Sequence, residues 1–138
     1  MGFSDSNSAS VTIRCPGGEA VELMVRAAQT FGLDRALAVD HAARLSIIVE
    51  ELVYNLVEHG DVGPDDLIEL VLTHEEGVVG IMLSDSGTSF DPRIAEASDT
   101  VPERGGGVGI DLVRAWADIV DYRSDAEGNR LLLKMWFS

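Results

Sequence analysis

Two apolar runs, residues 67–73 and 78–84, lie close together in the chain and are joined by the polar segment His74-Glu75-Glu76-Gly77. Each run is short, rich in Leu, Ile and Val, and almost continuously apolar, which is typical of strands in a sheet with at least one well-covered face. A glycine-containing connection of four residues is typical of a β-hairpin. The sequence therefore predicts a sheet with antiparallel neighbours and a covering layer.

Two segments with helical periodicity precede this hairpin. The first has four apolar residues on one helical face: Val21, Met24, Val25 and Ala28. The second has a longer apolar stripe: Leu45, Ile48, Val49, Leu52 and Leu56. We expect the first helix to stop at Gly32, Asp34 to be the N-cap of the second, and Gly60 to end the second.

Further strands are predicted near both ends of the chain. Residues 11–13 fit a short edge strand, and Pro16-Gly17-Gly18 fits the turn after it. Near the C-terminus, residues 119–123 and 130–137 fit two strands around a turn at Glu127-Gly128-Asn129.

A polar loop and a third helix separate the hairpin from the closing strands. The loop covers residues 85–104, and the helix carries Ile110, Val113 and Ala117 on one face. The order is therefore β, α, α, β, β, loop, α, β, β. It predicts an α/β (α+β) two-layer sandwich, in which a mixed, mostly antiparallel sheet is covered on one face by helices.

Length and composition indicate one globular domain. The chain has 138 residues, of which we expect 1–10 to be a flexible tail and 11–138 to form the domain. No apolar run approaches the length of a membrane span, and the small, polar start is unlike a secretory signal. Cys15 is the single cysteine, which suits a reduced thiol, so we expect a cytoplasmic protein without membrane contact.

The charge of the chain bears on its partners. Its 24 acids and 10 bases give a formal net charge of −14. Direct binding of nucleic acid is disfavoured, because neutralising phosphates requires clusters of Lys and Arg. An acidic surface serves solubility, and it also suits the capture of a basic protein.

Glu51 and Asn55 are four residues apart and therefore stack on one face of the second helix, beside its apolar stripe. Asn in the middle of a helix costs roughly half a kcal/mol relative to Ala, so its presence there indicates a partner. An amide oxygen is a hard ligand that Mg²⁺ accepts beside phosphates and water. The alternative is that both residues lie on a solvated helix surface.

Asp85 follows the second run of the hairpin, at the expected end of a strand, and Gly87 comes two residues later. A carboxylate in this position can accept a hydrogen bond from the amine of adenine, and a glycine allows close approach of a ligand. The alternative is an ordinary turn, in which Asp85 caps the backbone.

A glycine run, Gly105-Gly106-Gly107-Val108-Gly109, precedes the third helix, and Arg104 stands directly before it. Backbone N–H groups at a helix start bind phosphate, and Arg104 either adds a charge there or lies in solvent. A mobile linker is the alternative. No βαβ unit surrounds the run, which disfavours a dinucleotide fingerprint. No Lys-Ser or Lys-Thr follows a glycine here, which excludes a P-loop.

Taken together, these three segments resemble the motifs of the GHKL superfamily of ATPases and kinases, which includes gyrase, Hsp90 and the histidine kinases. Glu51, Asn55 and His59-Gly60 resemble its N box. Asp85, Gly87 and Phe90-Asp91-Pro92 resemble its G1 box, and residues 104–114 resemble its G2 box.

The resemblance covers residues 10–137 and is closest to the bacterial anti-sigma factor serine-protein kinases. One position departs from the pattern: many members carry a second G1 glycine where this chain has Ser89. His41 lacks the acidic neighbour that follows the phosphoacceptor histidine of histidine kinases, so we expect it to be a surface residue.

The resemblance implies a fold, a cofactor and roles for the residues. The fold is the Bergerat, or histidine kinase-like ATPase, fold, and the cofactor is ATP with Mg²⁺. Asn55 holds the ion, Glu51 is the general base, and Asp85 with Gly87 recognises adenine. The phosphates lie against the segment that starts at Arg104 and contains Gly105, Gly106, Gly107, Val108 and Gly109.

It also implies an activity and partners. The activity is that of a serine/threonine-protein kinase, which transfers the γ-phosphoryl group of ATP to a Ser or Thr of an anti-anti-sigma partner and regulates a sigma factor. One alternative is a non-catalytic switch in which residues 90–104 respond to the nucleotide. Another is a detached histidine kinase catalytic domain, against which we count the lack of a preceding helix pair with a phosphoacceptor. Whether the chain forms a homodimer is left open.

Overall fold

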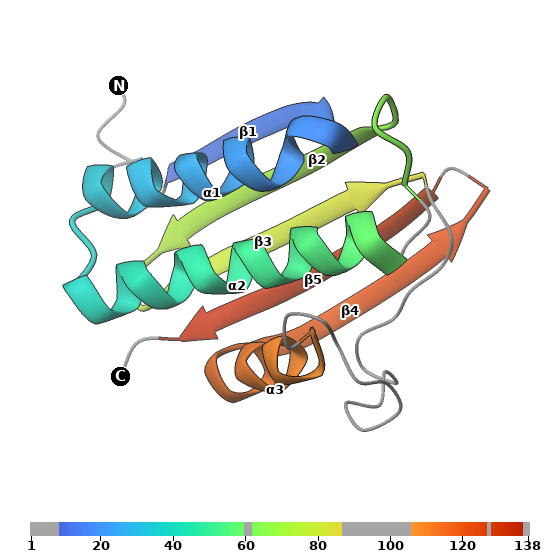
Figure 1. Cartoon of the computed structure of the whole chain (residues 1–138). Coiled ribbons are helices and arrows are strands. Elements are labelled where there is room, and N and C mark those ends of the chain that lie inside the picture. Colours follow the sequence, from blue (N-terminus) through green and yellow to red (C-terminus); the bar gives the residue numbers. More distant parts are fainter. Residues whose placement is uncertain (1–8, 60–61, 87–105, 127, 137–138) are drawn as a thin grey trace.

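A computed structural model describes residues 9–59, 62–86, 106–126 and 128–136, with the backbone alone at 106–110 (Figure 1). The elements of this part of the chain are β1 (Ala9–Pro16), α1 (Gly17–Asp34), α2 (Val39–His59), β2 (Leu67–Glu75), β3 (Val78–Asp85), α3 (Gly106–Trp116), β4 (Asp118–Asp125) and β5 (Gly128–Trp136). None of these helices is long and apolar enough to cross a lipid bilayer. The predicted order of elements is confirmed.

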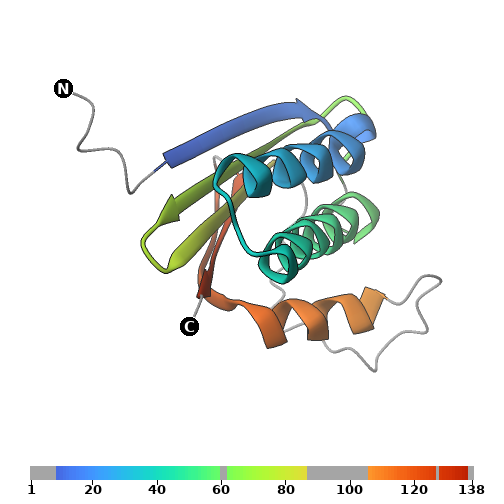
Figure 2. The same ribbon diagram turned by 90° about the vertical axis from the view of Figure 1, so that its left-hand side faces the viewer.

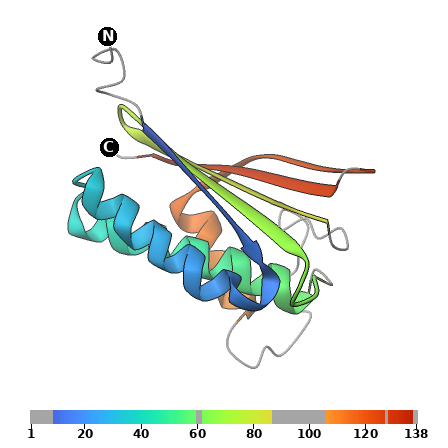
Figure 3. The same cartoon turned by 90° about the horizontal axis from the view of Figure 1, so that it is seen from above.

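The five strands form one sheet in the order β1-β2-β3-β5-β4. Every neighbouring pair among them is antiparallel, so the sheet described here is not mixed. The three helices of the described residues all lie on the same side of this sheet (Figure 3). The predicted two-layer sandwich with one covered face is therefore confirmed.

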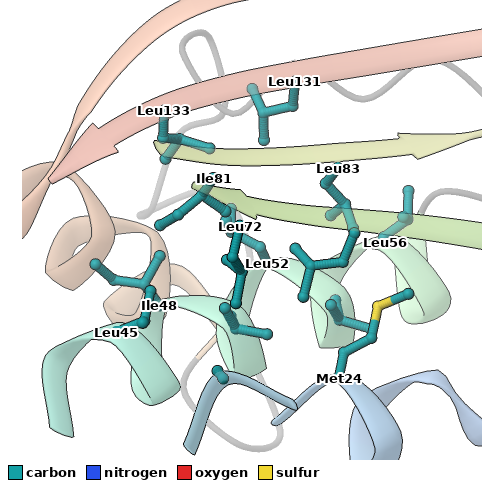
Figure 4. Packing of buried hydrophobic residues seen from close by; sticks show 14 of the residues in the cluster. Met24, Leu45, Ile48, Leu52, Leu56, Leu72, Ile81, Leu83, Leu131 and Leu133 are labelled. Carbon is teal, nitrogen blue, oxygen red and sulfur yellow. The ribbon is translucent and has the colours of Figure 1, made fainter. Parts of the chain in front are cut away.

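Alternation along the strands produces the core. Over most of β2, β3 and β5, buried side chains alternate with exposed or partly exposed ones. Apolar residues of both layers meet between sheet and helices (Figure 4): Met24, Leu45, Ile48, Leu52, Leu56, Leu72, Ile81, Leu83, Leu131 and Leu133. Each such side chain contributes roughly 1.5–3 kcal/mol on full burial, which is why the apolar stripe of α2 faces the sheet.

The hairpin of β2 and β3 is tighter than the sequence indicates. Glu75 pairs with Val78, so only two residues, Glu76 and Gly77, form the turn. Gly77 has φ 79°, a conformation that glycine adopts without steric cost. The predicted four-residue connection is wrong because His74 continues the ladder and pairs with β1 and β3.

Helix α1 starts directly after β1, without the predicted turn at 16–18. The backbone N–H of Gly17 donates to the carbonyl oxygen of Asp66 at 2.8 Å, which satisfies one of the free donors of the helix start. A Cβ on Gly17 would lie 2.6 Å from the carbonyl oxygen of Gly63. This glycine therefore serves close approach of a distant segment, and β1 is longer at both ends than the predicted 11–13.

Helix α1 also continues through Gly32 and ends at Asp34. A Cβ on Gly32 would lie 3.0 Å from Cβ of Ala42, so this glycine allows α1 and α2 to pack closely. Asp34 is not the N-cap of α2, because the chain turns at Ala36, with φ 55°, before α2 begins. The predicted end of α2 at Gly60 lies outside the described residues.

Candidate functional site

Glu51 and Asn55 are buried on α2, with 9% and 3% of their surfaces exposed. This burial contradicts the alternative of a solvated helix surface. Arg44 lies on the same helical face, since positions 44, 51 and 55 recur at helical spacing. Its guanidinium lies over the ring of Trp116, 5.5 Å from the ring centroid. The face of α2 that carries Glu51 and Asn55 is therefore turned toward α3.

Helices α2 and α3 run in opposite directions (Figure 2). Trp116 ends α3 and contacts the first half of α2, so the start of α3 lies toward the half that carries Asn55. In Figure 1 the end of β3 lies at the same end of the molecule as the end of α2. Three elements thus bring the predicted N box, Asp85 and the glycine segment to one end.

The glycine run belongs to the helix itself. Helix α3 begins at Gly106, so Gly106, Gly107, Val108 and Gly109 form its first turn. The first four N–H groups of a helix have no partner inside it, and they carry the positive end of the helix dipole. The predicted phosphate donors are therefore backbone groups of α3. Gly87, Ser89, Arg104 and Gly105 lie outside the described residues.

Asn55 has a buried amide in need of a partner. Its Nδ2 atom is inaccessible to water and makes no hydrogen bond with any residue in the described part of the chain. A buried polar group without a hydrogen bond costs roughly 1–3 kcal/mol. An amide of this kind fits a nucleotide with Mg²⁺, since the nitrogen can donate to a phosphate oxygen and the oxygen can ligate the ion.

Asp85 is the last residue of β3 and pairs with Asn129 of β5. The Asn129 Nδ2 atom donates to Oδ1 of Asp85 at 3.0 Å. The hydroxyl of Ser124 in β4 donates to Oδ1 of Asn129 at 2.7 Å. Asp85 is therefore held by Asn129 of the neighbouring strand β5, which Ser124 of β4 supports in turn. The predicted turn-capping alternative does not include this support.

Asn129 is the site residue that the sequence reasoning missed. The segment Glu127-Gly128-Asn129 reads as a turn, but Gly128 and Asn129 are the first residues of β5, and Asn129 is only 6% exposed. Gly128 has φ 127°, and a Cβ there would collide with the carbonyl oxygen of Asp85. An Asn after a Gly is typical of turns, so no local pattern marks this one as a strand residue.

Two titratable groups that are not among the predicted site residues have shifted pKa values. Burial and the nearby charge of Arg35 lower the pKa of His74, whose Nδ1 accepts a hydrogen bond from Arg35 Nε at 3.0 Å. Burial, and to a lesser degree the charge of Glu19, raises the pKa of Cys15. His74 packs edge-on against Phe31, so it is part of the contact between α1 and β2.

Comparison with known proteins gives one family and a set of similar folds. A model of the family described as histidine kinase-like ATPase domain matches residues 18–135. A search of curated proteins finds no match.

Two solved structures are similar in fold. One is the histidine kinase domain from the Erythrobacter litoralis EL346 blue-light activated histidine kinase, with TM-score 0.54 and 16% identity over 87% of this chain. The chain spans 60% of the length of that domain. The other is the catalytic domain of the histidine kinase ThkA in a nucleotide-free form, with TM-score 0.50, 13% identity, and coverage of 91% of this chain and 97% of that one.

Proposed function

The chain belongs to the histidine kinase-like ATPase domain family, and we propose that it binds Mg-ATP and transfers the γ-phosphoryl group to a Ser or Thr of a partner protein. The family implies nucleotide binding. The serine/threonine specificity, the anti-anti-sigma partner and the regulated sigma factor are part of the proposal, and they rest on the resemblance of the three motifs to the anti-sigma factor kinases.

The observation that carries the proposal is the burial of Glu51 and Asn55 on the face of α2 turned toward α3. A carboxylate and an amide are costly to bury without polar partners. A phosphorylated ligand between the helices would give both groups such partners. The Nδ2 atom of Asn55, which has no hydrogen-bond partner among the described residues, supports this placement. An ordinary structural helix would carry apolar residues at these positions.

Each residue has a proposed role in the transfer. Asn55 holds the ion and a phosphate, and the N–H groups at the start of α3 hold further phosphate oxygens. Glu51 accepts the proton of the attacking hydroxyl, as a general base within reach of the acceptor. Asp85 accepts from the amine of adenine. When bound, Mg-ATP supplies the phosphoryl group and the positive charge that offsets the charge of the phosphates.

The acidic character of the chain supports a protein partner. With a formal net charge of −14, the chain attracts a basic surface and repels nucleic acid. A sigma factor that is itself basic on its binding face meets this requirement. The phosphorylated partner is expected to present a Ser or Thr on an exposed segment.

A second candidate is the catalytic domain of a histidine kinase, which the likeness to two such domains favours. A third is a nucleotide-dependent switch without turnover. The three differ in the product. A serine kinase forms an acid-stable phosphoester, a histidine kinase forms an acid-labile phosphoramidate, and a switch forms neither.

The test is transfer from ATP labelled at the γ-phosphate. The wild-type chain and Glu51→Gln are each incubated with the cytoplasmic protein fraction of the source organism, and labelled proteins are treated with acid or alkali. We expect an acid-stable, alkali-labile label on one small protein, lost with Glu51→Gln. An acid-labile label would establish the histidine kinase candidate, and nucleotide binding without any label would establish the switch.

A further inference from the structure

Ser124, Asn129 and Asp85 form a chain of hydrogen bonds across three strands. The Ser124 hydroxyl donates to Asn129 Oδ1 at 2.7 Å, and Asn129 Nδ2 donates to Asp85 Oδ1 at 3.0 Å. An amide has a donating end and an accepting end, and an ionised carboxylate can only accept, so Asp85 takes the donating end of Asn129 and the Ser124 hydroxyl donates to the other end. With the amide reversed, its oxygen would face the oxygen of Asp85, which is repulsive.

The backbone adds a second constraint on this amide. Asn129 is directly opposite Asp85 in the pairing of β3 and β5. Gly128, with φ 127°, starts β5 at a position where any side chain would collide with Asp85. With Asn129 only 6% exposed, both its backbone and its side chain are held in place.

We propose that Asn129 is a positioning residue for base recognition, and that Ser124 holds its amide in place from the side opposite Asp85. This inference rests on the proposed function, in which Asp85 reads the amine of adenine. A fixed donor on one oxygen restricts the rotation of a carboxylate, which favours acceptance from an amine in a particular direction. Preorganisation of this kind raises affinity for the base that matches and lowers it for the base that does not.

A purely structural role would have different consequences. If the three residues only fastened the β4–β5 hairpin to β3, their loss would lower the free energy of unfolding. The affinities for ATP, GTP and inosine triphosphate would then fall by the same factor. The ratio of affinities for two bases separates the two roles, because overall stability cancels in it.

The experiment measures the Kd of the full chain for Mg-ATP, Mg-GTP and Mg-inosine triphosphate by calorimetry. The bases of GTP and inosine triphosphate both carry a carbonyl oxygen where adenine has its amine. We expect Asn129→Leu to reduce the preference for ATP by roughly tenfold or more, as for loss of a hydrogen bond to a charged group. Ser124→Ala should reduce it in the same direction by a smaller factor, and Ser124 is exposed, so this variant tests the inference even if Asn129→Leu fails to fold.

Arg123→Gln is the matched control. Arg123 precedes Ser124 in β4, pairs in register with Arg130 and forms an ion pair with Asp121 at 3.0 Å. We expect Arg123→Gln to have the nucleotide affinities of the wild type and the same preference for ATP. If folded Ser124→Ala and Asn129→Leu both keep the wild-type preference, the inference is overturned and the proposed function stands. If the wild type binds none of the three nucleotides, the inference and the proposed function are both overturned.

Discussion

The guanidinium of Arg44 lies over the ring of Trp116, 5.5 Å from its centroid, and this contact joins α2 to α3. Trp116 is half-buried at the last position of α3. The contact therefore fixes α3 against the helix face that carries Glu51 and Asn55. The start of α3, where phosphate is proposed to bind, is positioned by a contact at its opposite end.

We predict that Arg44→Ala weakens Mg-ATP binding severalfold, although Arg44 is not one of the residues proposed to bind the nucleotide. The lost cation–π contact is worth about 0.5–1 kcal/mol at an exposed site, and it holds the helix that is proposed to supply the phosphate donors. Calorimetry measures the affinity. Lys134→Ala is the control, because Lys134 makes the same kind of contact with Trp136, at 5.7 Å, away from α2. Equal loss in both variants would contradict a role of this contact in the site.

Replacing Asn55 should have opposite effects on binding and on stability. Asn55→Leu removes an amide whose nitrogen is unpartnered within the described residues, so we expect the nucleotide-free protein to become more stable by about 1–3 kcal/mol. The same change should abolish measurable Mg-ATP binding. Chemical denaturation and calorimetry check the two effects. Ser46→Ala, which removes a local bond to Ala43 on the same helix, should change neither by much.

Glu51→Gln should bind Mg-ATP almost normally and transfer phosphate about 10²- to 10⁴-fold more slowly, because a general base acts in the transition state. Single-turnover transfer to the cognate partner gives the rate. Glu50→Gln is the control, since Glu50 is half-buried and points about 100° away around the helix. Full activity of Glu51→Gln would remove Glu51 from the mechanism.

Asp85→Asn should weaken ATP binding and reduce the preference for ATP over GTP. An amide can present its nitrogen to the carbonyl oxygen of guanine, whereas the carboxylate of Asp85 can only accept. Competition of the two nucleotides for one fluorescent analogue measures the ratio. A variant with the ratio of the wild type would show that the base is read elsewhere.

His74 should make stability depend on pH. Its pKa in the folded chain is below the ordinary value of 6.5, so the unfolded chain binds the proton more readily. The stabilising effect of neutral His74 is therefore fully present above pH 6.5 and is lost as the pH falls through the folded pKa. Denaturation at several pH values should show a steeper acid loss in the wild type than in His74→Gln. Parallel curves would contradict the prediction.

The fold could be predicted from the sequence because apolar residues recur with clear strand and helix periodicity. The β2–β3 hairpin and the long stripe of α2 follow from local patterns, and so does the placement of Glu51 beside Asn55 on one helical face. Asn55 stood out because it is polar beside an apolar stripe. Its role, like those of Glu51 and Asp85, stays a prediction.

The errors arose where a residue serves a distant contact. Gly17, Gly32 and Gly128 read as turn or stop signals, yet they allow approach of Gly63, Ala42 and Asp85. Asn129 was missed for the same reason, since its partner is far away in the sequence. A window of neighbouring residues carries no information about such long-range contacts. At these positions tertiary packing overrides the local turn propensity of glycine.

The pairing of β3 with β5 brings Asp85 beside Asn129. This pairing closes a long loop of chain, which includes α3 and β4. The hairpins β2–β3 and β4–β5 close over tight turns, and local closures of this kind cost the least entropy and form the fastest. We therefore expect the two hairpins to form before they join. The proposed discrimination between bases would then be acquired in the last steps of folding, so nucleotide selectivity would report on a completed sheet.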